Sequence, residues 1–436
     1  HPVMPVRRDE AGKLIALPTS RGGDVALESM IYIETVRVDA KERRKLLQTI
    51  ETTLADVRAA VNDWPRLVEA MAHDAALLTD SEGAELLEWF RSGMLTQLGH
   101  VTRRRDGSHT QLLGICRRGA KALLADASYD RAFAWFDDAL AKGDLRVPLV
   151  VKANHIATVH RRVPLDLFLV PLIDDGKVSA ISVHAGIWTS AALNTPPDRV
   201  PRLRQQLAGL STKLGFDPNG HTGKALTHAL TSLPHDLVIG FSDADVERVA
   251  TTMTSLVDRP RPRLLLVEAP LARHLMAFVW LSRDMHSVAM RRSIQTMIEE
   301  AVGAPALDWS LQVESGTLAM LRYVIDIRDV GGLPAEKELD TRLQTMLRGW
   351  GEAVEAALAA DGDSSRAAVI TARYAEAFPL GYRTDYGPQE AAIDIRHMRK
   401  LAGGDVEGAQ GKADKRDVRL YRHASDGDGQ LRLKIY

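Results

Sequence analysis

Four apolar runs decide the fold of this chain: RLLLVE (263–268), LMAFVWLS (275–282), DWSLQVE (308–314) and LAMLRYVIDI (318–327). Each has the length and the β-branched or aromatic content of a strand. Between the second and third runs, apolar residues recur at helical spacing after the cap Ser287 and before the stop Gly303: Met290, Ile294, Met297, Ile298 and Val302. A second helix is predicted from about Ala335 to Ala360. The order ββαββα is that of a ferredoxin-like sheet whose last strand has moved to the front.

Such a sheet is expected to be antiparallel, with two helices on one face and the other face free. Small regulatory domains of the ACT type use such faces and edges for pairing and for amino-acid binding. The fold class predicted for the whole chain is therefore α+β and multidomain, with ferredoxin-like, ACT-type antiparallel sheets joined by helical segments.

The opening of the chain is predicted to contain strands at 1–8 and 30–38, followed by a helix from Asp39 that ends near Asn62, Asp63 and Pro65. Because the chain starts and stops inside strand patterns, we expect a piece of a longer polypeptide. The expected units are 1–62, the second half of a truncated ACT-like unit; 63–92, a helical connector; 93–194, a mixed β unit of ACT or PAS type; 195–258, a helical motif; 260–334, the ACT-like sheet unit; 335–402, a second helical motif; and 412–436, the start of a further β unit.

Composition excludes several classes of protein. The 436 residues carry a formal net charge of −1, whereas nucleic-acid-binding proteins usually have a basic excess. No apolar run approaches the roughly 20 residues of a membrane span. Cys116 is the single cysteine, so an internal disulfide framework and a cysteine zinc site are ruled out. We expect Cys116 to be a buried strand residue in a protein of the reducing cytoplasm.

The usual catalytic motifs are missing from the sequence. No GxGxxG follows a strand, and GHTGKA (220–225) departs from the phosphate-loop pattern in its glycine spacing and in its last residue. No HExxH is present, and the turn at 314–316 is not GxSxG. We therefore predict no catalytic, cofactor-binding or metal-ligating residue in this chain.

A basic run at VVKANHIATVHRRV (150–163) is the best remaining candidate for a site. On an extended strand Lys152, His160 and Arg162 share one face, while Arg161 falls on the other. The run can be an anion or effector site, a solvated or salt-bridged interface, or a catalytic strand; structure or interface is favoured over effector binding, and both over catalysis. The candidate effector or interface contacts are Lys152, Asn154, His160, Arg161 and Arg162.

The same stretch resembles a known family. KAN (152–154), TVHR (158–161), GIWTSAA (186–192), GFDP (215–218) and RYAEAFP (373–379) are similar, in order, to blocks of the amino-terminal region of the large bacterial NAD-specific glutamate dehydrogenases. The similarity runs essentially from end to end. HIA (155–157) departs from the more polar stretch expected there, and the loop between Arg105 and Thr110 is short.

The resemblance implies a longer parent enzyme that oxidises L-glutamate to 2-oxoglutarate and ammonia with NAD as cofactor. Substrate and NAD would bind in a downstream catalytic domain, and no cofactor is expected on this piece. The piece would be a cytoplasmic regulatory and assembly region that self-associates, with a tetramer favoured, and contacts its own catalytic domain. An amino-acid effector is expected at the sheet edges around 263–328. The alternative is a freestanding ACT-type amino-acid-binding or scaffold protein.

Overall fold

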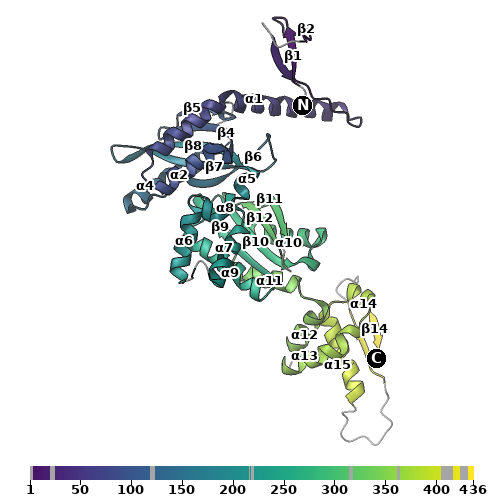
Figure 1. Cartoon of the computed structure of the whole chain (residues 1–436). Coiled ribbons are helices and arrows are strands. Elements are labelled where there is room, and N and C mark those ends of the chain that lie inside the picture. Colours follow the sequence, from purple (N-terminus) through teal and green to yellow (C-terminus); the bar gives the residue numbers. More distant parts are fainter. Residues whose placement is uncertain are drawn as a thin grey trace, which may run out of the picture. The chain divides into compact units, whose positions relative to one another are not determined.

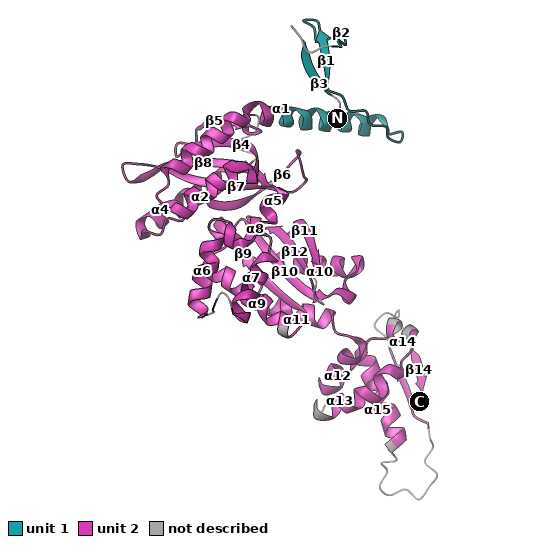
Figure 2. Ribbon diagram, viewed as in Figure 1, with its two compact units in different colours: residues 1–58 teal, residues 59–436 magenta. Residues whose placement is uncertain are grey.

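The computed structural model describes residues 3–19, 25–117, 123–215, 217, 220–313, 318–360, 364–403, 416–422 and 431–436. The chain forms two compact units, residues 1–58 and 59–436 (Figure 2). By sequence, the long helix α1 (Ala40–Leu77) belongs to both units (Figure 1).

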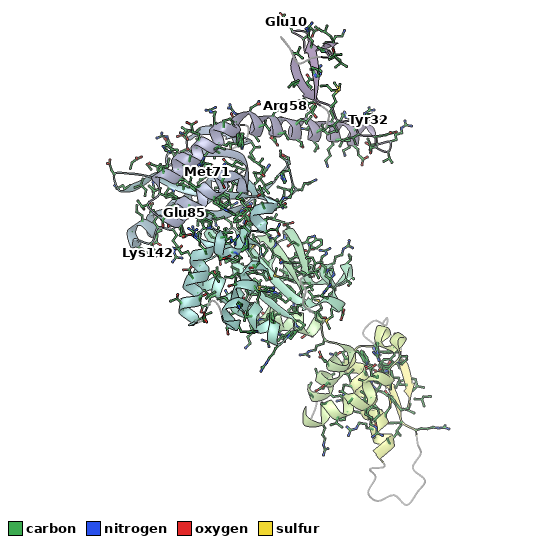
Figure 3. All side chains as sticks on the ribbon, viewed as in Figure 1. Glu10, Tyr32, Arg58, Met71, Glu85 and Lys142 are labelled. Carbon is green, nitrogen blue, oxygen red and sulfur yellow. The ribbon has the colours of Figure 1, made fainter. Side chains whose placement is uncertain are left out.

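The first unit contains a small antiparallel sheet in the order β2-β1-β3. Its strands are β1 (Val3–Arg8), β2 (Leu14–Ala16) and β3 (Ala26–Ser29). The strand predicted at 30–38 is wrong, because residues 30–38 are irregular and the pairing segment is β3. Apolar composition favours a strand there, but Tyr32, labelled in Figure 3, is 87% exposed. Without burial, β propensity alone does not make a strand.

Helix α1 begins where the sequence predicts and ends much later. The Asp39 carboxylate accepts hydrogen bonds from the backbone N–H groups of Lys41 and Glu42 at 2.7 and 2.9 Å. The predicted end near Asn62 is wrong, since the helix runs through Pro65 to Leu77. The reason is tertiary: Leu67 and Met71 are fully buried beyond the proline, and this burial outweighs the lost backbone hydrogen bond.

A five-stranded antiparallel sheet follows, in the order β5-β4-β8-β7-β6. Its strands are β4 (Leu95–Arg104), β5 (His109–Gly114), β6 (Leu149–Ile156), β7 (Pro164–Asp174) and β8 (Lys177–Trp188). The central strands are buried at nearly every position because both faces are covered. One face packs on α4 (Asp126–Lys142), and the other on the end of α1 and on α2 (Ser81–Trp89). Cys116 lies just after β5, not within a strand as predicted, and is buried, which raises the pKa of its thiol to about 12.

Short helices connect this sheet to the next. They are α5 (Ser190–Leu193), α6 (Leu203–Leu214), α7 (His221–Thr231), α8 (His235–Val238) and α9 (Asp243–Asp258). Ser242 caps α9 by accepting a hydrogen bond from the Asp245 N–H at 3.2 Å. Single-turn helices lie at Phe90–Met94, Pro197–Arg199, Pro270–Ala272, Arg283–Met285 and Ala375–Ala377.

The ββαββα prediction is confirmed. Strands β9 (Arg263–Glu268), β10 (His274–Ser282), β11 (Ala306–Val313) and β12 (Leu318–Asp326) form an antiparallel sheet in the order β11-β12-β10-β9. This is the order of a ferredoxin-like sheet with its last strand moved to the front. Helices α10 (Val288–Val302) and α11 (Glu336–Met346) cover one face (Figure 1).

The other face of this sheet is not free, contrary to expectation. Met276, Phe278 and Trp280 of β10 share one core with Leu230 of α7 and Val249 of α9. Alternation places these large apolar side chains opposite the helix-covered face, and burying them stabilises the chain by about 1.5–3 kcal/mol each. The helical segment is therefore a cover for the sheet and links it to the preceding sheet.

Carboxylates of α11 protect the edge strand β9. Asp340 Oδ1 accepts a hydrogen bond from the Leu264 N–H at 2.7 Å, and Glu336 Oε2 accepts one from the Leu266 N–H at 2.9 Å. Two backbone donors that an edge strand would leave unpaired are thus satisfied. The Arg263 guanidinium lies 2.5 Å from the Asp340 carboxylate and compensates its charge.

The single helix predicted at 335–360 is two helices, because α11 ends at Met346 and α12 (Trp350–Ala360) begins after Gly349. Helices α13 (Ser364–Tyr374), α14 (Leu380–Asp385) and α15 (Pro388–Gly403) follow, and then the antiparallel pair of β13 (Val418–Tyr421) and β14 (Arg432–Ile435). The helices from α12 to α15 share a small core of their own. Among the helices in the described part of the chain, none is long and apolar enough to cross a membrane.

Candidate functional site

Lys152 is the centre of a buried charge cluster. Its ammonium nitrogen lies 2.6 Å from Asp166 Oδ1 and 2.5 Å from Asp236 Oδ2. The three side chains are 8%, 3% and 19% exposed. Such a cluster persists only because the charges compensate one another, since an unpaired buried charge is strongly unfavourable.

Strand register explains how the cluster forms. Lys152 of β6 is the direct cross-strand partner of Asp166 of β7, so both side chains leave the sheet on the same face. Two residues away on each strand, Val150 and Phe168 enter the apolar core that this face shares with the helical segment. Asp236 joins from the first turn of α8, just after Pro234.

Burial and pairing compete in setting the pKa values of this cluster. Burial raises the pKa of Asp166 to about 7, against the opposing effect of Lys152. For Asp236 and Lys152 the charge partners outweigh burial, so the Asp236 pKa is lowered and the Lys152 pKa is raised. One ammonium thus holds one carboxylate firmly ionised, and the second carboxylate is short of positive charge.

A cavity of about 310 Å³ opens beside the cluster. Its wall comes from the five-stranded sheet, from the helical segment and from the edge strand β11 and its neighbour β12 in the second sheet. The charged lining residues are Lys152, Arg161, Arg322, Asp166, Asp236 and Asp308. Apolar side chains of Val163, Ile187, Leu193, Leu233 and Val324 complete much of the wall. A concave site with a few convergent polar groups has the character of a small-molecule pocket.

Two of the five sequence-predicted contacts, Lys152 and Arg161, line this cavity. His160 and Arg162 are exposed and do not line it, and the Asn154 side chain lies outside the described residues. The extended-strand parity does not hold, because the chain turns after Ile156 and His160 adopts a positive φ of 69°. This turn brings Arg161 to the Lys152 side, where its guanidinium donates to the Trp188 carbonyl oxygen.

Sequence reasoning missed the acidic half of the site. Asp166 interrupts an otherwise apolar strand, PLDLFLV (164–170), and a lone acid in a buried strand is a usable signal. Asp236, Asp308 and Arg322 lie far from it in the sequence and have no local pattern. They reach the cavity only through tertiary packing.

A second buried polar cluster lies in the five-stranded sheet. Asp74 of α1, His100 of β4 and His184 of β8 have potential metal-ligand atoms within 4.8 Å of one another, and all three residues are buried. His184 Nε2 lies 2.7 Å from Asp74 Oδ2, and His100 Nε2 lies 2.9 Å from the hydroxyl of Ser182, which donates to Asp74. The two histidines are 84 positions apart, so spacing rules could not group them.

Proton counting describes what this second cluster can do. His100 Nδ1 must donate to the Gln111 carbonyl oxygen, 3.1 Å away, and each of the three other contacts also needs one proton. Neutral Ser182, His100 and His184 supply three protons for four contacts. Burial and the neighbouring His184 lower the pKa of His100 to about 4. With both imidazole rings neutral, the cluster is therefore one proton short of full hydrogen bonding.

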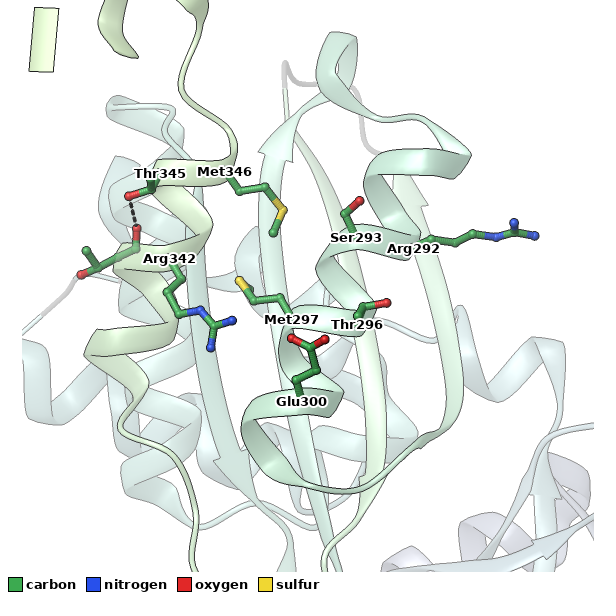
Figure 4. Close-up of a pocket in the computed structure, with 9 residues that line it drawn as sticks. Arg292, Ser293, Thr296, Met297, Glu300, Arg342, Thr345 and Met346 are labelled. Atoms are coloured by element: carbon green, nitrogen blue, oxygen red, sulfur yellow. Dashed lines mark hydrogen bonds between the residues drawn. The ribbon is translucent and has the colours of Figure 1, made fainter. Parts of the chain in front are cut away.

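An open groove of about 670 Å³, larger than the cavity at Lys152, lies between α10 and α11 (Figure 4). Met297 and Met346 face each other across it, and Glu300 and Arg342 lie beside them (Figure 4). No buried charge cluster adjoins the residues described there. The smaller cavity at Lys152 is therefore the stronger candidate site.

Comparison with known proteins follows this geometry. Residues 200–259 match the family model "Glutamate dehydrogenase, helical motif 1", residues 263–351 match "Glutamate dehydrogenase, ACT2 domain" and residues 357–401 match "Glutamate dehydrogenase, helical motif 2". The ACT2 match covers the ββαββα sheet and confirms its ACT-type character.

Whole proteins show the same relationship. The chain is 28% identical over its full length to an NAD-specific glutamate dehydrogenase of Halomonas elongata and 25% identical to one of Pseudomonas aeruginosa. One from Mycobacterium tuberculosis is 22% identical over 96% of the chain. The chain spans 28% of the length of the first two relatives and 26% of the third. Along its whole length, the chain is thus similar to one region of the large NAD-specific glutamate dehydrogenases.

Proposed function

We propose that this chain is the non-catalytic, amino-terminal regulatory and assembly region of an NAD-dependent glutamate dehydrogenase. The parent enzyme would convert L-glutamate, NAD+ and water to 2-oxoglutarate, ammonia and NADH in the cytoplasm. The observation that carries this proposal is the end-to-end similarity, which includes an ACT2 sheet and two helical motifs.

The residues present do not fit an NAD site. In the described part of the chain, no strand is followed by the glycine-rich turn and helix that hold a pyrophosphate. We therefore derive no step through NAD from this chain. Hydride transfer and glutamate binding would belong to a separate catalytic domain of the parent.

The proposed regulatory role uses the cavity at Lys152. Its wall joins the five-stranded sheet, the helical segment and the ACT2 sheet, so an occupant contacts all three. A ligand shifts a conformational equilibrium only when it binds the alternative states differently, and a site built from several structural elements allows such a difference. Self-association into a tetramer is proposed as the framework in which this shift reaches the catalytic domains.

Two measurements test the proposal. The purified chain, free of host enzyme, is expected to give no glutamate-dependent NADH formation, and robust NADH formation would overturn the non-catalytic role. Reading the gene beyond Tyr436 is expected to show a continuing frame with a glycine-rich NAD motif. A stop codon there would favour the alternative, a freestanding ACT-type amino-acid-binding or scaffold protein.

A further inference from the structure

The charges on the cavity wall balance. Lys152, Arg161 and Arg322 provide three cations, and three aspartates, Asp166, Asp236 and Asp308, provide three anions. All three carboxylates have a cationic neighbour: Asp166 and Asp236 share Lys152 at 2.6 and 2.5 Å, and Asp308 lies 3.3 Å from Arg322. A ligand with a net charge would leave that charge uncompensated in a largely buried site, which is unfavourable. The cavity therefore fits a molecule of zero net charge.

Hydrogen-bonding groups on the same wall remain unmatched. Asp166 Oδ1 is buried, shares the Lys152 ammonium with Asp236, and has no other hydrogen-bond donor among the described residues. The Nε atoms of Arg161 and Arg322 are also buried, and neither donates a hydrogen bond within the described structure. Each unmet buried group costs about 1–3 kcal/mol, and native structures contain few of them. Two buried donors are thus unmatched, and one buried acceptor shares its donor with a second carboxylate.

We infer that the cavity binds a neutral, short-chain α-amino acid as its zwitterion, with the ammonium at Asp166 and the carboxylate at Arg161 and Arg322. A zwitterion supplies a donor of its own to Asp166, which otherwise shares Lys152 with Asp236, and it supplies acceptors to the unmatched Nε atoms of the two arginines, with no change in net charge. The cavity of about 310 Å³ lies at the small end of the range for ligand pockets. Ile187 and Leu193 offer apolar contact for a short side chain.

The raised pKa of Asp166, about 7, agrees with this assignment. Its carboxylate lacks a full cationic partner, and a ligand ammonium would supply one. The location overlaps the region around 263–328 that the sequence suggested, through the edge strand β11 and its neighbour β12. The cavity uses the side of the ACT2 sheet opposite α10 and α11, together with two other parts of the chain. The inference rests on the proposed effector role of this cavity and names its ligand class.

Calorimetric titration of the whole chain tests the inference. L-alanine, L-serine and L-valine are expected to bind. Propionate and ethylamine, which each carry one of the two charges, are expected to bind at least 10-fold more weakly, as are L-glutamate and L-lysine. Equal binding of propionate and alanine, or no heat from any of the three neutral amino acids, would overturn the inference.

Matched variants locate the site. Arg161→Gln and Asp166→Asn are each expected to weaken L-alanine binding at least 10-fold, and Arg162→Gln, an exposed neighbour outside the cavity, is expected to leave it unchanged. Thermal melting checks that the variants fold, and Arg161→Gln is the safer of the two because its side chain is only partly buried. Wild-type affinity in a folded Arg161→Gln variant would remove the cavity as the site.

The enzyme assay separates this inference from the proposed function. In the full-length parent enzyme, L-alanine is expected to change the initial rate of glutamate oxidation, and Arg161→Gln to abolish that change. Alanine binding to the chain without any effect on the enzyme rate would support the site and overturn its regulatory role. A rate effect that persists in Arg161→Gln would overturn the site and keep a regulatory role elsewhere.

Discussion

Replacing Lys152 by Met removes the ammonium that lies between the Asp166 and Asp236 carboxylates while keeping most of the apolar side-chain volume. Its contacts with Asp166 and Asp236 are 2.6 and 2.5 Å long, and the lysine side chain is 8% exposed. Removing one partner of a buried pair typically costs about 3–5 kcal/mol. We expect a loss of this size at pH 8, carried mainly by Asp236, because the Asp166 pKa is already about 7.

The loss should depend on pH with a definite sign. Without Lys152, both carboxylates acquire folded-state pKa values above their unfolded values. Stability from a group with a raised pKa is present at low pH and is lost as pH rises through the folded pKa. Each pH unit above the folded-state pKa of a carboxylate lowers the free energy of unfolding by about 1.4 kcal/mol. The deficit of Lys152→Met is therefore expected to grow from pH 5.5 to pH 8, by up to about 3 kcal/mol for one carboxylate.

Hydrogen exchange of the β6 and β7 amides at the two pH values is the suitable assay, because a chain with several cores need not unfold in one step. Thermal melting gives an independent check. Lys177→Met is the matched control, since Lys177 is exposed on β8 of the same sheet, and it should change exchange by less than about 0.5 kcal/mol. A Lys152→Met variant as stable as the wild type at pH 8, or equally destabilised at both pH values, would refute the ion-pair reasoning.

Three further predictions concern single buried contacts. Asp340→Ala leaves the edge donor Leu264 N–H unpaired and should cost about 1–3 kcal/mol, seen as faster exchange of β9 amides and not of β6. Asp63→Asn weakens a bidentate pair with Arg117, whose contacts are 2.5 and 2.6 Å long, and should lower the melting temperature at pH 7. Pairing lowers the Asp63 pKa to about 2, so the difference in melting temperature between the variant and the wild type should shrink only as pH falls below about 4. His100→Gln should be less stable than the wild type at pH 6.5, and this difference in the free energy of unfolding should decrease as pH falls to 4. The reason is that the buried His100, whose pKa is about 4, disfavours folding of the wild type once the unfolded chain takes up its proton. A pH-independent difference in urea titrations would contradict that pKa.

The ACT2 sheet could be read from sequence because its signals are local. Strand-length runs, a serine cap and a glycine stop each act within a few residues, and they determine the ββαββα order. The strand wrongly expected at 30–38 has the same kind of signal, with Ile31, Tyr32 and Ile33 in a row. Its side chains are exposed, so the pattern lacks the burial that turns propensity into a strand.

Two basic residues of the candidate site could be predicted from local sequence, whereas its acidic residues were not predicted. The basic run drew attention to Lys152 and Arg161, but strand parity separated them, and only the turn after Ile156 unites them. Asp236 reaches Lys152 across 84 positions, and Arg322 comes from another sheet. The sequence run shows the positive charges and so suggests an anion site. The structure adds the carboxylates that compensate them, and the site is charge-balanced.

Charge balance also determines how ligand binding in the cavity could be coupled to the arrangement of the two sheets. An anion site would bind any small acid and would draw Lys152 away from Asp236, at the expense of a buried pair. In the observed arrangement that pair is satisfied, so a ligand adds contacts at Asp166, Arg161 and Arg322 without breaking it. Arg322 belongs to the ACT2 sheet, whereas Asp166 belongs to the five-stranded sheet. A zwitterion that contacts both sheets is therefore expected to bind most tightly when the two sheets are held at the observed spacing. A preference of about 1–3 kcal/mol for that state is the usual scale of allosteric coupling.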